Sequence, residues 1–487
     1  MRALRLAVLT TVLCSGLAAS QSAPAATHVA RLVRITSTPA LTPSYSPSIH
    51  DYVVRCNPAT PVRFSAWAAA GTTAMIDGRS ASSTAVRLEA GQAATIEGRA
   101  AAGETDYHVR CLPQDFPQWT EATVGSSGIW TIATPTLSLG TARSHYIVVF
   151  DEHGVPVWWY KARRVPIDAK LLPQPGGQSP AIAFSSFPAS SEEYQVRRLD
   201  GTFVRRIVSP DGQIDDHELQ VDSNGDYAFL VYAPKSGVDL TPFGGPADAT
   251  VLQGEIEEVN PAGKLVWSWS TDGHVSMSES ARWVKTILSM PVPLAGGVQG
   301  YDFFHANAVS LGRSIVLLSL RQTDGVYAID RATGQILWKL GGTPTPESLT
   351  VVGDPADATD PLGGQHDARL LPDGTVTVFD DGTLLGRAPR ALHFRIDPVA
   401  RTATLIGEVS DPTVTSSFCC GSARLLASGN WLVSWGGDPV VGEYRPDGTP
   451  VWRLSFDGLF SYRIVPVALG ELSADELRAG MDAMASR

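Results

Sequence analysis

Short runs of apolar and β-branched residues, broken by turns, recur along the chain, and residues 302–342 show this pattern most clearly. The stretch contains runs of strand length at 308–311, 314–320, 325–330 and 335–340. Leu-Gly, Thr-Asp-Gly and Ala-Thr-Gly form the turns between them. Close spacing with Gly and Asp in the turns predicts antiparallel hairpins. One such sheet cannot bury both of its faces alone, so the pattern predicts an array of sheets.

The same pattern returns from residue 116 onward. Six segments resemble the last hairpin of this stretch; they begin at Gly154, Gly201, Gly263, Gly334, Thr402 and Gly448. Six other segments are candidates for the innermost strand of each sheet; they begin at Ile167, His217, His305, His366, Gly421 and Phe460. We therefore predict an all-β protein with a six-bladed β-propeller over residues 116–470. Because the segment at Phe460 follows the last hairpin, we expect it to complete the first blade and close the ring.

Smaller units flank the predicted propeller. Residues 27–115 contain short strand-like runs between turns rich in Ser, Thr, Gly and Ala, which predicts a small β-sandwich that resembles cadherin-like repeats. Residues 471–487 begin with the capping box Ser473-Ala-Asp-Glu476 and continue with helix formers, which predicts a terminal helix. Insertions rich in Pro, Gly and Asp interrupt the repeat; they lie at 234–253, 271–301 and 342–364. Long loops of this kind are often functional, and two of them lead directly into predicted inner strands.

Composition and the first residues indicate the compartment. The chain has 487 residues, of which 45 are Gly and 34 are Pro, and this composition indicates a fold with many turns. Its formal charge of −11 argues against nucleic acid or an anionic membrane as a partner. Residues 1–26 have the basic end, short apolar run and small-residue cleavage site of a secretory signal. We therefore expect a secreted or periplasmic protein.

The cysteines fit an oxidising compartment. Cys56 and Cys111 have nearly the same context, Tyr-Val-Val-Arg-Cys and Tyr-His-Val-Arg-Cys, which predicts neighbouring strands and a disulfide. Cys419 and Cys420 are adjacent, so they form either a vicinal disulfide or two free thiols.

Three of the ten histidines stand at the start of predicted inner strands, namely His217, His305 and His366. Inner strands of a propeller lie side by side around the channel, so these imidazoles are expected to converge at one mouth. Asn307 lies two residues beyond His305, on the same face of its strand. Arg321 ends the second strand of that blade. A buried guanidinium needs either a carboxylate, for which Asp324 and Asp330 are candidates, or a bound oxyanion.

Imidazole, amide and guanidinium groups together form a site for a tetrahedral oxyanion. Arg321 disfavours protonation of the histidines and so preserves a nucleophilic lone pair, while Asp367 is one candidate for orienting His366. Three imidazoles are also a ligand set for zinc or copper, although Arg321 argues against a cation. Two further alternatives are a pyrroloquinoline-quinone-type propeller and a non-catalytic binding propeller.

From residue 117 to 466 the sequence resembles the arylsulfate sulfotransferase family. The motifs that carry the resemblance are Asp-Phe-Phe-His305-Ala-Asn307, Ser-Leu-Arg321, the hairpin at 327–338, Gly-Gln-His366-Asp-Ala-Arg and the segment 429–436. The resemblance implies transfer of a sulfuryl group from an aryl sulfate to a phenol, without phosphoadenosine phosphosulfate or another cofactor.

For this chain, the resemblance implies that His366 is the nucleophile and becomes transiently sulfurylated. It also implies that His217, His305, Asn307 and Arg321 bind sulfate or assist transfer. The family's hydroxyl residue on the last blade has no clear counterpart within 416–422. The sequence leaves open whether the protein forms a homodimer.

Overall fold

The computed structural model describes residues 30–485, apart from 124–127, 175–177, 188–192, 295, 296, 357, 358 and 469. The predicted signal at 1–26 lies outside the described residues. Within them the chain is all-β, with many strands and two α-helices, α1 (Val284–Ser289) and α2 (Ala474–Ala485). None of the described helices has the length and apolar character needed to cross a membrane.

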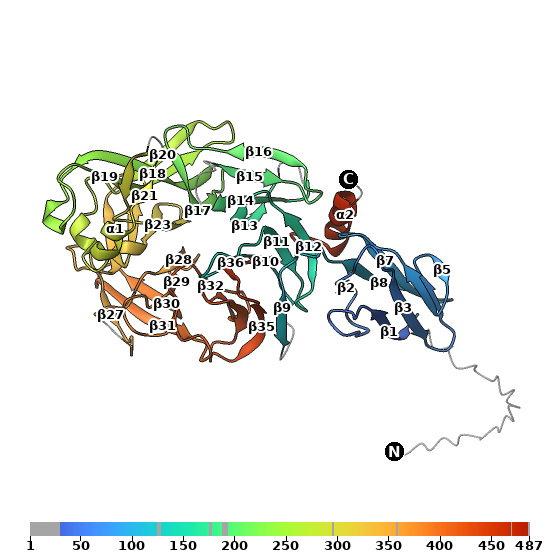
Figure 1. Cartoon of the computed structure of the whole chain (residues 1–487). Coiled ribbons are helices and arrows are strands. Elements are labelled where there is room, and N and C mark those ends of the chain that lie inside the picture. Colours follow the sequence, from blue (N-terminus) through green and yellow to red (C-terminus); the bar gives the residue numbers. More distant parts are fainter. Residues whose placement is uncertain are drawn as a thin grey trace, which may run out of the picture.

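Two sheets form the N-terminal unit (blue in Figure 1). Its strands are β1 (Leu32–Thr38), β2 (Asp51–Val54), β3 (Val62–Ala68), β4 (Thr73–Ile76), β5 (Arg79–Ser80), β6 (Ser83–Val86), β7 (Ala93–Ala100) and β8 (Gly103–Cys111). The sheet orders are β1-β3-β6 and β2-β8-β7-β4-β5. Alternate residues of β7 are buried, as expected of a sheet that packs on one face.

The predicted disulfide lies within the N-terminal unit. Strands β2 and β8 are parallel neighbours, with Val54 opposite Cys111, and Cys56 is bonded to Cys111. Both cysteines are buried in the core of the unit. The similar sequence contexts therefore predicted the neighbouring strands and the bond correctly.

Six further sheets have four strands each, with extra strands on three of them; in five sheets the four strands are consecutive, and in the sixth β36 joins β10, β11 and β12. Their strands are β9 (Trp119–Thr123), β10 (Trp130–Leu137), β11 (Tyr146–Phe150), β12 (Pro156–Lys161), β13 (Val165–Leu172), β14 (Ala181–Phe187), β15 (Tyr194–Arg197), β16 (Phe203–Ile207), β17 (Gln213–Val221), β18 (Tyr227–Val238), β19 (Ala249–Val259), β20 (Leu265–Ser270), β21 (Val292–Pro293), β22 (Gln299–Tyr301), β23 (Ala306–Leu311), β24 (Ile315–Leu320), β25 (Gly325–Asp330), β26 (Ile336–Gly341), β27 (Thr350–Val352), β28 (His366–Leu370), β29 (Val376–Asp380), β30 (Arg390–Asp397), β31 (Thr402–Val409), β32 (Ser422–Leu425), β33 (Trp431–Ser434), β34 (Val440–Tyr444), β35 (Pro450–Phe456) and β36 (Phe460–Val467).

These sheets follow one another around a ring in Figure 1. One strand of each contacts the corresponding strand of the next, in the cycle β13, β17, β23, β28, β32, β36 and back to β13. We call these the inner strands. Strand β36 pairs antiparallel with β10, so the C-terminal strand completes the sheet of β10, β11 and β12. At the same junction, the early strand β9 pairs with the outer strand β35 of the last sheet, which the sequence did not predict.

Helix α2 (red in Figure 1) packs on β12, beside the N-terminal unit. Its start has the reciprocal bonds of a capping box: Ser473 N donates to Glu476, and Glu476 N donates to Ser473 Oγ. Its Arg478 pairs with Asp51 at 2.5 Å, and its Asp482 pairs with Arg110 at 2.7 Å. The helix therefore ties the N-terminal unit to the ring.

The disulfide of the N-terminal unit gives a prediction for stability. Replacing both cysteines by alanine, Cys56→Ala with Cys111→Ala, removes a link across 55 residues. In the chain-entropy model the free energy of unfolding of this unit falls by about 4 kcal/mol. Hydrogen exchange of peptides from β7 and β8 at increasing urea measures the loss, with peptides from β23 to β26 as the internal control. Equal protection of β7 and β8 in both proteins would contradict the prediction.

Candidate active site

The structure brings the three predicted histidines together. His217 lies in β17, His305 directly precedes β23 and His366 begins β28, so they belong to three consecutive inner strands. The rings of His217 and His305 have centroids 4.8 Å apart. The ring of Tyr462, on β36, lies 5.7 Å from that of His217 and 6.5 Å from that of His366. Tyr462 thus lies between two of the imidazoles.

Irregular backbone positions these side chains. The pairing register shifts within β13, β17, β23 and β28, near the histidines on the last three of these strands. His305 and Asp367 have φ angles of +48° and +54°, in the left-handed region. Bulges of this kind redirect side chains next to active sites, and non-glycine residues at positive φ require support from their surroundings.

A carboxylate contacts the Nδ1 atom of each histidine. Asp302 Oδ2 lies 2.7 Å from Nδ1 of His305, and Asp215 contacts Nδ1 of His217. Asp381 Oδ2 lies 2.7 Å from Nδ1 of His366. Because each carboxylate engages Nδ1, Nε2 is the ring nitrogen of each histidine that is left for other partners.

The tautomer of His366 follows from its neighbours. Its Nδ1 lies 3.0 Å from the carbonyl of Gly364, which only accepts hydrogen bonds, so Nδ1 carries the proton. The backbone N–H of Cys420 donates to Nε2 at 3.1 Å, so Nε2 carries the lone pair. Burial, followed by the charge of Arg321, lowers the pKa of His366 well below its ordinary value. His366 is therefore neutral at pH 7, with its lone pair on Nε2.

His217 has the opposite electrostatic setting. Burial acts to lower its pKa, but Asp215, with a smaller contribution from Asp216, outweighs burial and raises the pKa to about 9. Asp216 is itself buried, and burial raises its pKa to about 7. His217 is therefore protonated at pH 7 and can donate a proton from Nε2.

Arg321 begins a 3-10 turn, Arg321–Thr323, directly after β24. Its side chain is buried, its guanidinium lies 4.3 Å from the centre of the Trp283 ring, and Nη2 donates to the Phe418 carbonyl at 2.6 Å. The two carboxylates considered as partners of Arg321 bond to other groups. Asp324 pairs with Arg282 at 3.1 Å, and Asp330 accepts hydrogen bonds within its own turn.

Among the residues that the structure describes, no carboxylate lies within ion-pair distance of Arg321, and its buried Nε has no hydrogen-bond partner. The alternative of a salt bridge to Asp324 or Asp330 is therefore wrong. A buried cation without a counter-ion is costly, and an anion bound beside it would lower that cost.

Asn307 is fully buried on β23. Its Nδ2 donates to the carbonyl of Gln365 at 2.7 Å, which places Asn307 next to the residue before His366. Within the described chain its Oδ1 has no hydrogen-bond partner. Asn307 thus offers a free acceptor as well as its second amide hydrogen.

Sequence reasoning missed several groups, above all Asp381 and the segment 417–420. Ser417 Oγ donates to Asp381 Oδ1 at 2.5 Å, while the carbonyl of Phe418 and the N–H of Cys420 contact Arg321 and His366. Asp215 and Asp302 precede their histidines by two and three residues, and this spacing was a signal that could have been used. Asp381 follows a different strand, so no local spacing points to it.

The alternative role considered for Asp367 is wrong. Its carboxylate accepts two bonds from Arg424, both at 2.7 Å, and two from Arg369, at 2.5 and 3.0 Å. It therefore belongs to a buried charge network and does not orient His366, a role that Asp381 has.

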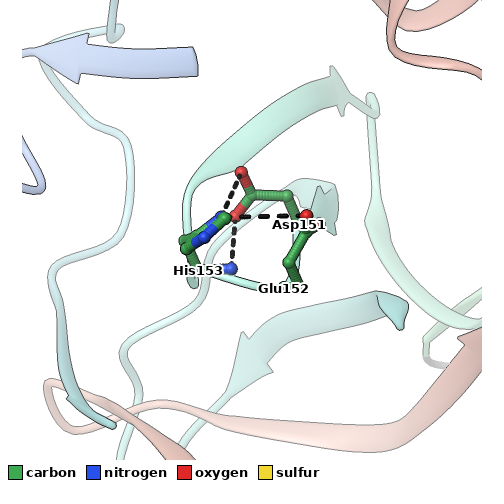
Figure 2. Close-up of side chains that lie close together, drawn as sticks. All are labelled: Asp151, Glu152 and His153. Atoms are coloured by element: carbon green, nitrogen blue, oxygen red, sulfur yellow. Dashed lines mark hydrogen bonds and ion pairs between the residues drawn. The ribbon is translucent and has the colours of Figure 1, made fainter. Parts of the chain in front are cut away.

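Three groups of carboxylates and histidines have ligand atoms within 4.8 Å of one another in the described residues. They are Asp151, Glu152 and His153; Asp215, Asp216 and His217; and Asp222, Asp226 and Glu258. The set of three site histidines is not one of them. Figure 2 shows the first group, in the turn between β11 and β12, where Asp151 accepts the backbone N–H of His153 at 2.9 Å. That carboxylate stabilises its own turn.

The ring of β-sheets thus brings a neutral imidazole, a protonated imidazole and a guanidinium without a carboxylate in ion-pair contact into one site. The sequence matches the arylsulfotransferase (ASST) family over residues 190–457, more than half of the chain. The chain therefore belongs to the arylsulfotransferase family, which supports a sulfotransferase activity with aryl sulfates and phenols as substrate classes.

Solved structures resemble the chain more distantly. A protein of unknown function from Bacteroides caccae has 15% identity and a TM-score of 0.41, and the match covers 70% of this chain and 99% of that one. Virginiamycin B lyase from Staphylococcus aureus has 11% identity and a TM-score of 0.36, with coverage of 69% and 99%. A putative 6-phosphogluconolactonase from Bacteroides fragilis has 12% identity and a TM-score of 0.32, with coverage of 82% and 99%. No curated protein sequence matches the chain.

The carboxylate beside His217 gives a prediction that needs no substrate. In Asp215→Asn, the charge that raises the pKa of His217 is lost while burial remains, so the pKa falls from about 9. At pH 8 a smaller fraction of His217 is then protonated in the variant than in the parent protein. Ring-nitrogen NMR titration measures this. Asp216→Asn is the matched control and gives a smaller decrease; an unchanged pKa in Asp215→Asn would refute the assignment.

Proposed function

We propose that this protein transfers a sulfuryl group from an aryl sulfate to a phenol in two steps, through a sulfurylated His366. The observation that carries the proposal is the state of His366. It is a neutral imidazole with Nε2 as its lone-pair nitrogen, held at Nδ1 by Asp381, in a site whose guanidinium has no counter-ion. A neutral imidazole is a good nucleophile when its orientation is fixed.

We further infer that the six sheets are the blades of a six-bladed propeller spanning residues 116–470. The cycle of contacts between inner strands supports this, as does the completion of the first sheet by β36. The two sheets of the N-terminal unit support a β-sandwich over 27–115, and α2 supports a helical tail over 471–487. The signal at 1–26 and the Cys56–Cys111 bond support export to an oxidising compartment.

Binding of the donor begins with its sulfate group. Arg321 provides the positive charge, and His305 and Asn307 provide polar atoms beside His366. A charge-assisted hydrogen bond of this kind contributes about 1.5–3 kcal/mol. Because these donors are already fixed by the fold, they favour a transition state whose charge spreads over the sulfuryl oxygens.

In the first step, the Nε2 lone pair of His366 attacks sulfur and the bond between sulfur and the aryl oxygen breaks. The bonding electrons go to that oxygen, which takes the Nε2 proton of His217 and leaves as the phenol. His366 keeps its Nδ1 proton, so its ring becomes positively charged, and Asp381 stabilises this charge at 2.7 Å. Burial raises the pKa of Asp381 above its ordinary value, while the hydrogen bond from Ser417 and the charge of Arg321 oppose this rise and favour the carboxylate.

In the second step, an acceptor phenol gives its proton to His217 and its oxygen attacks sulfur. The bond between sulfur and Nε2 breaks, and His366 regains its lone pair. Each step moves one proton and one sulfuryl group, so the cycle needs no external acid, base or redox partner. Because the pKa of His217 is raised and that of His366 is lowered, His217 carries the proton and His366 acts as the nucleophile.

The intermediate gives the first test. After mixing with p-nitrophenyl sulfate and quenching at high pH, we expect the peptide containing His366 to carry one sulfuryl group. His366→Asn, which has no nucleophilic lone pair, loses both the label and phenol release. His393→Asn, on β30 with Nε2 bonded to Thr375, is the matched histidine control. Full activity of His366→Asn without labelling would disprove the mechanism, and sulfate binding without phenol release would favour a non-catalytic propeller.

The pH dependence and the leaving group give the second test. Because His217 acts as an acid, kcat/KM falls as the pH rises through about 9, and because His366 must be neutral, kcat/KM falls only at a pH well below 6.5. His217→Asn lowers kcat about 10²–10⁴-fold with phenyl sulfate.

The loss in His217→Asn is smaller with p-nitrophenyl sulfate, because its more acidic phenol needs less protonation on leaving. An equal loss with both donors, or an alkaline limb that persists in the variant, would assign the proton to another group.

A further inference from the structure

The segment between β31 and β32 contacts three groups of the site at once. Ser417 Oγ donates to Asp381 at 2.5 Å, the Phe418 carbonyl accepts from Arg321 at 2.6 Å, and the Cys420 N–H donates to Nε2 of His366 at 3.1 Å. The last contact involves the atom that attacks sulfur in the proposed reaction. The backbone of Cys420 is therefore next to the reacting centre.

This backbone has an unusual conformation. Cys420 has a φ angle of +69°, in the left-handed region that residues with a side chain seldom occupy. Gly421 follows at +95°, where a Cβ atom would lie 2.4 Å from the ring of Phe379. The neighbouring Cys419 and Cys420 are bonded to each other. A disulfide between adjacent residues closes a small ring around their peptide bond, so it restricts the backbone at the point where the N–H is presented.

The hydroxyl groups of Ser417 and Ser422, on either side of the two cysteines, bond to groups other than His366. Ser417 Oγ is bonded to Asp381, and Ser422 Oγ donates to the carbonyl of Ile464 and accepts the N–H of the same residue. The Cys420 N–H is thus the group that this sheet directs to Nε2 of His366.

We propose that the Cys419–Cys420 disulfide is a positioning element of the active site, which holds the Cys420 N–H so that it bonds the sulfuryl group during transfer. When Nε2 forms its bond to sulfur, the N–H loses its acceptor and an oxygen on that sulfur takes its place. The bond is made only as transfer proceeds, so it favours the transition state. This inference rests on the proposed function of His366.

The test compares the oxidised and reduced protein. Excess dithiothreitol converts the disulfide to two thiols and is itself oxidised to its cyclic disulfide. The parent for this test is the Cys56→Ala, Cys111→Ala variant, in which Cys419–Cys420 is the disulfide left to reduce. A second protein adds Cys419→Ala and Cys420→Ala, and thiol counting confirms each state.

On reduction we expect the burst of p-nitrophenol release to slow about 10²-fold, the loss typical of one preorganised donor, with little change in KM. Reoxidation restores the rate, and the variant with four alanines is slow in both conditions. A second readout is the pKa of His366 by ring-nitrogen NMR. It rises on reduction, because the N–H no longer stabilises the lone pair of the neutral ring.

The two readouts separate the inference from the proposed function. If the oxidised protein forms no sulfurylated His366 but the pKa still rises on reduction, the proposed function fails and the placement of the N–H stands. If the burst rate is unchanged or increases on reduction, the inference is wrong. An unchanged pKa of His366 also overturns it, because the disulfide then does not hold the N–H on Nε2.

Discussion

The structure depends on a buried network of charges to which all six inner strands contribute. Arg463 of β36 pairs with Asp168 of β13 at 2.8 Å and Glu218 of β17 at 3.0 Å, and it donates to the carbonyl of Asn307 on β23 at 2.7 Å. Asp367 and Arg369 of β28 and Arg424 of β32 complete the network. Removing one partner from such a network leaves an uncompensated buried charge, at a cost of about 3–5 kcal/mol. A shift of β13, β17, β28, β32 or β36 by one residue would do the same, so the network favours the observed register of these five strands.

Fixing that register also fixes the candidate site. His217 precedes Glu218, His366 precedes Asp367 and Tyr462 precedes Arg463, so three of the network residues directly follow residues of the candidate site in the chain. The imidazoles then differ through their other neighbours. His217 lies beside Asp215 and Asp216 and has a raised pKa, whereas burial and Arg321 lower the pKa of His366. Local charges thereby separate the protonation states of two residues of the same type on one scaffold, and this difference is the basis of the acid and nucleophile roles proposed for them.

The repeat and the histidines were predictable because both are periodic. Equivalent positions of a repeat meet at the channel, so three rare residues at one position indicated a shared site. Pairings between distant residues were not predictable. Asp381 comes from the end of β29 and reaches His366 across a strand pair, while the nearer Asp367 is directed to Arg369 and Arg424 by a left-handed backbone. Residues 234–253 were predicted to be an irregular insertion, yet much of this stretch extends β18 and β19 into a long hairpin. Cross-strand pairing there outweighs the local turn signals of Pro and Gly.

The environment of the Arg321 guanidinium differs from that of the arginines in the buried charge network. Arg463, Arg369 and Arg424 have carboxylate partners that bring their charges close to balance, and burial alone would raise the pKa of Glu218, which Arg369, Arg463 and Lys170 instead lower well below its ordinary value. Arg321 lacks such a partner and is held by a carbonyl and the face of Trp283. A fold can keep one uncompensated charge of this kind only if its other interactions supply the stability that the charge removes. In the proposed reaction, the sulfate group of the donor supplies the negative charge that these two contacts of Arg321 lack.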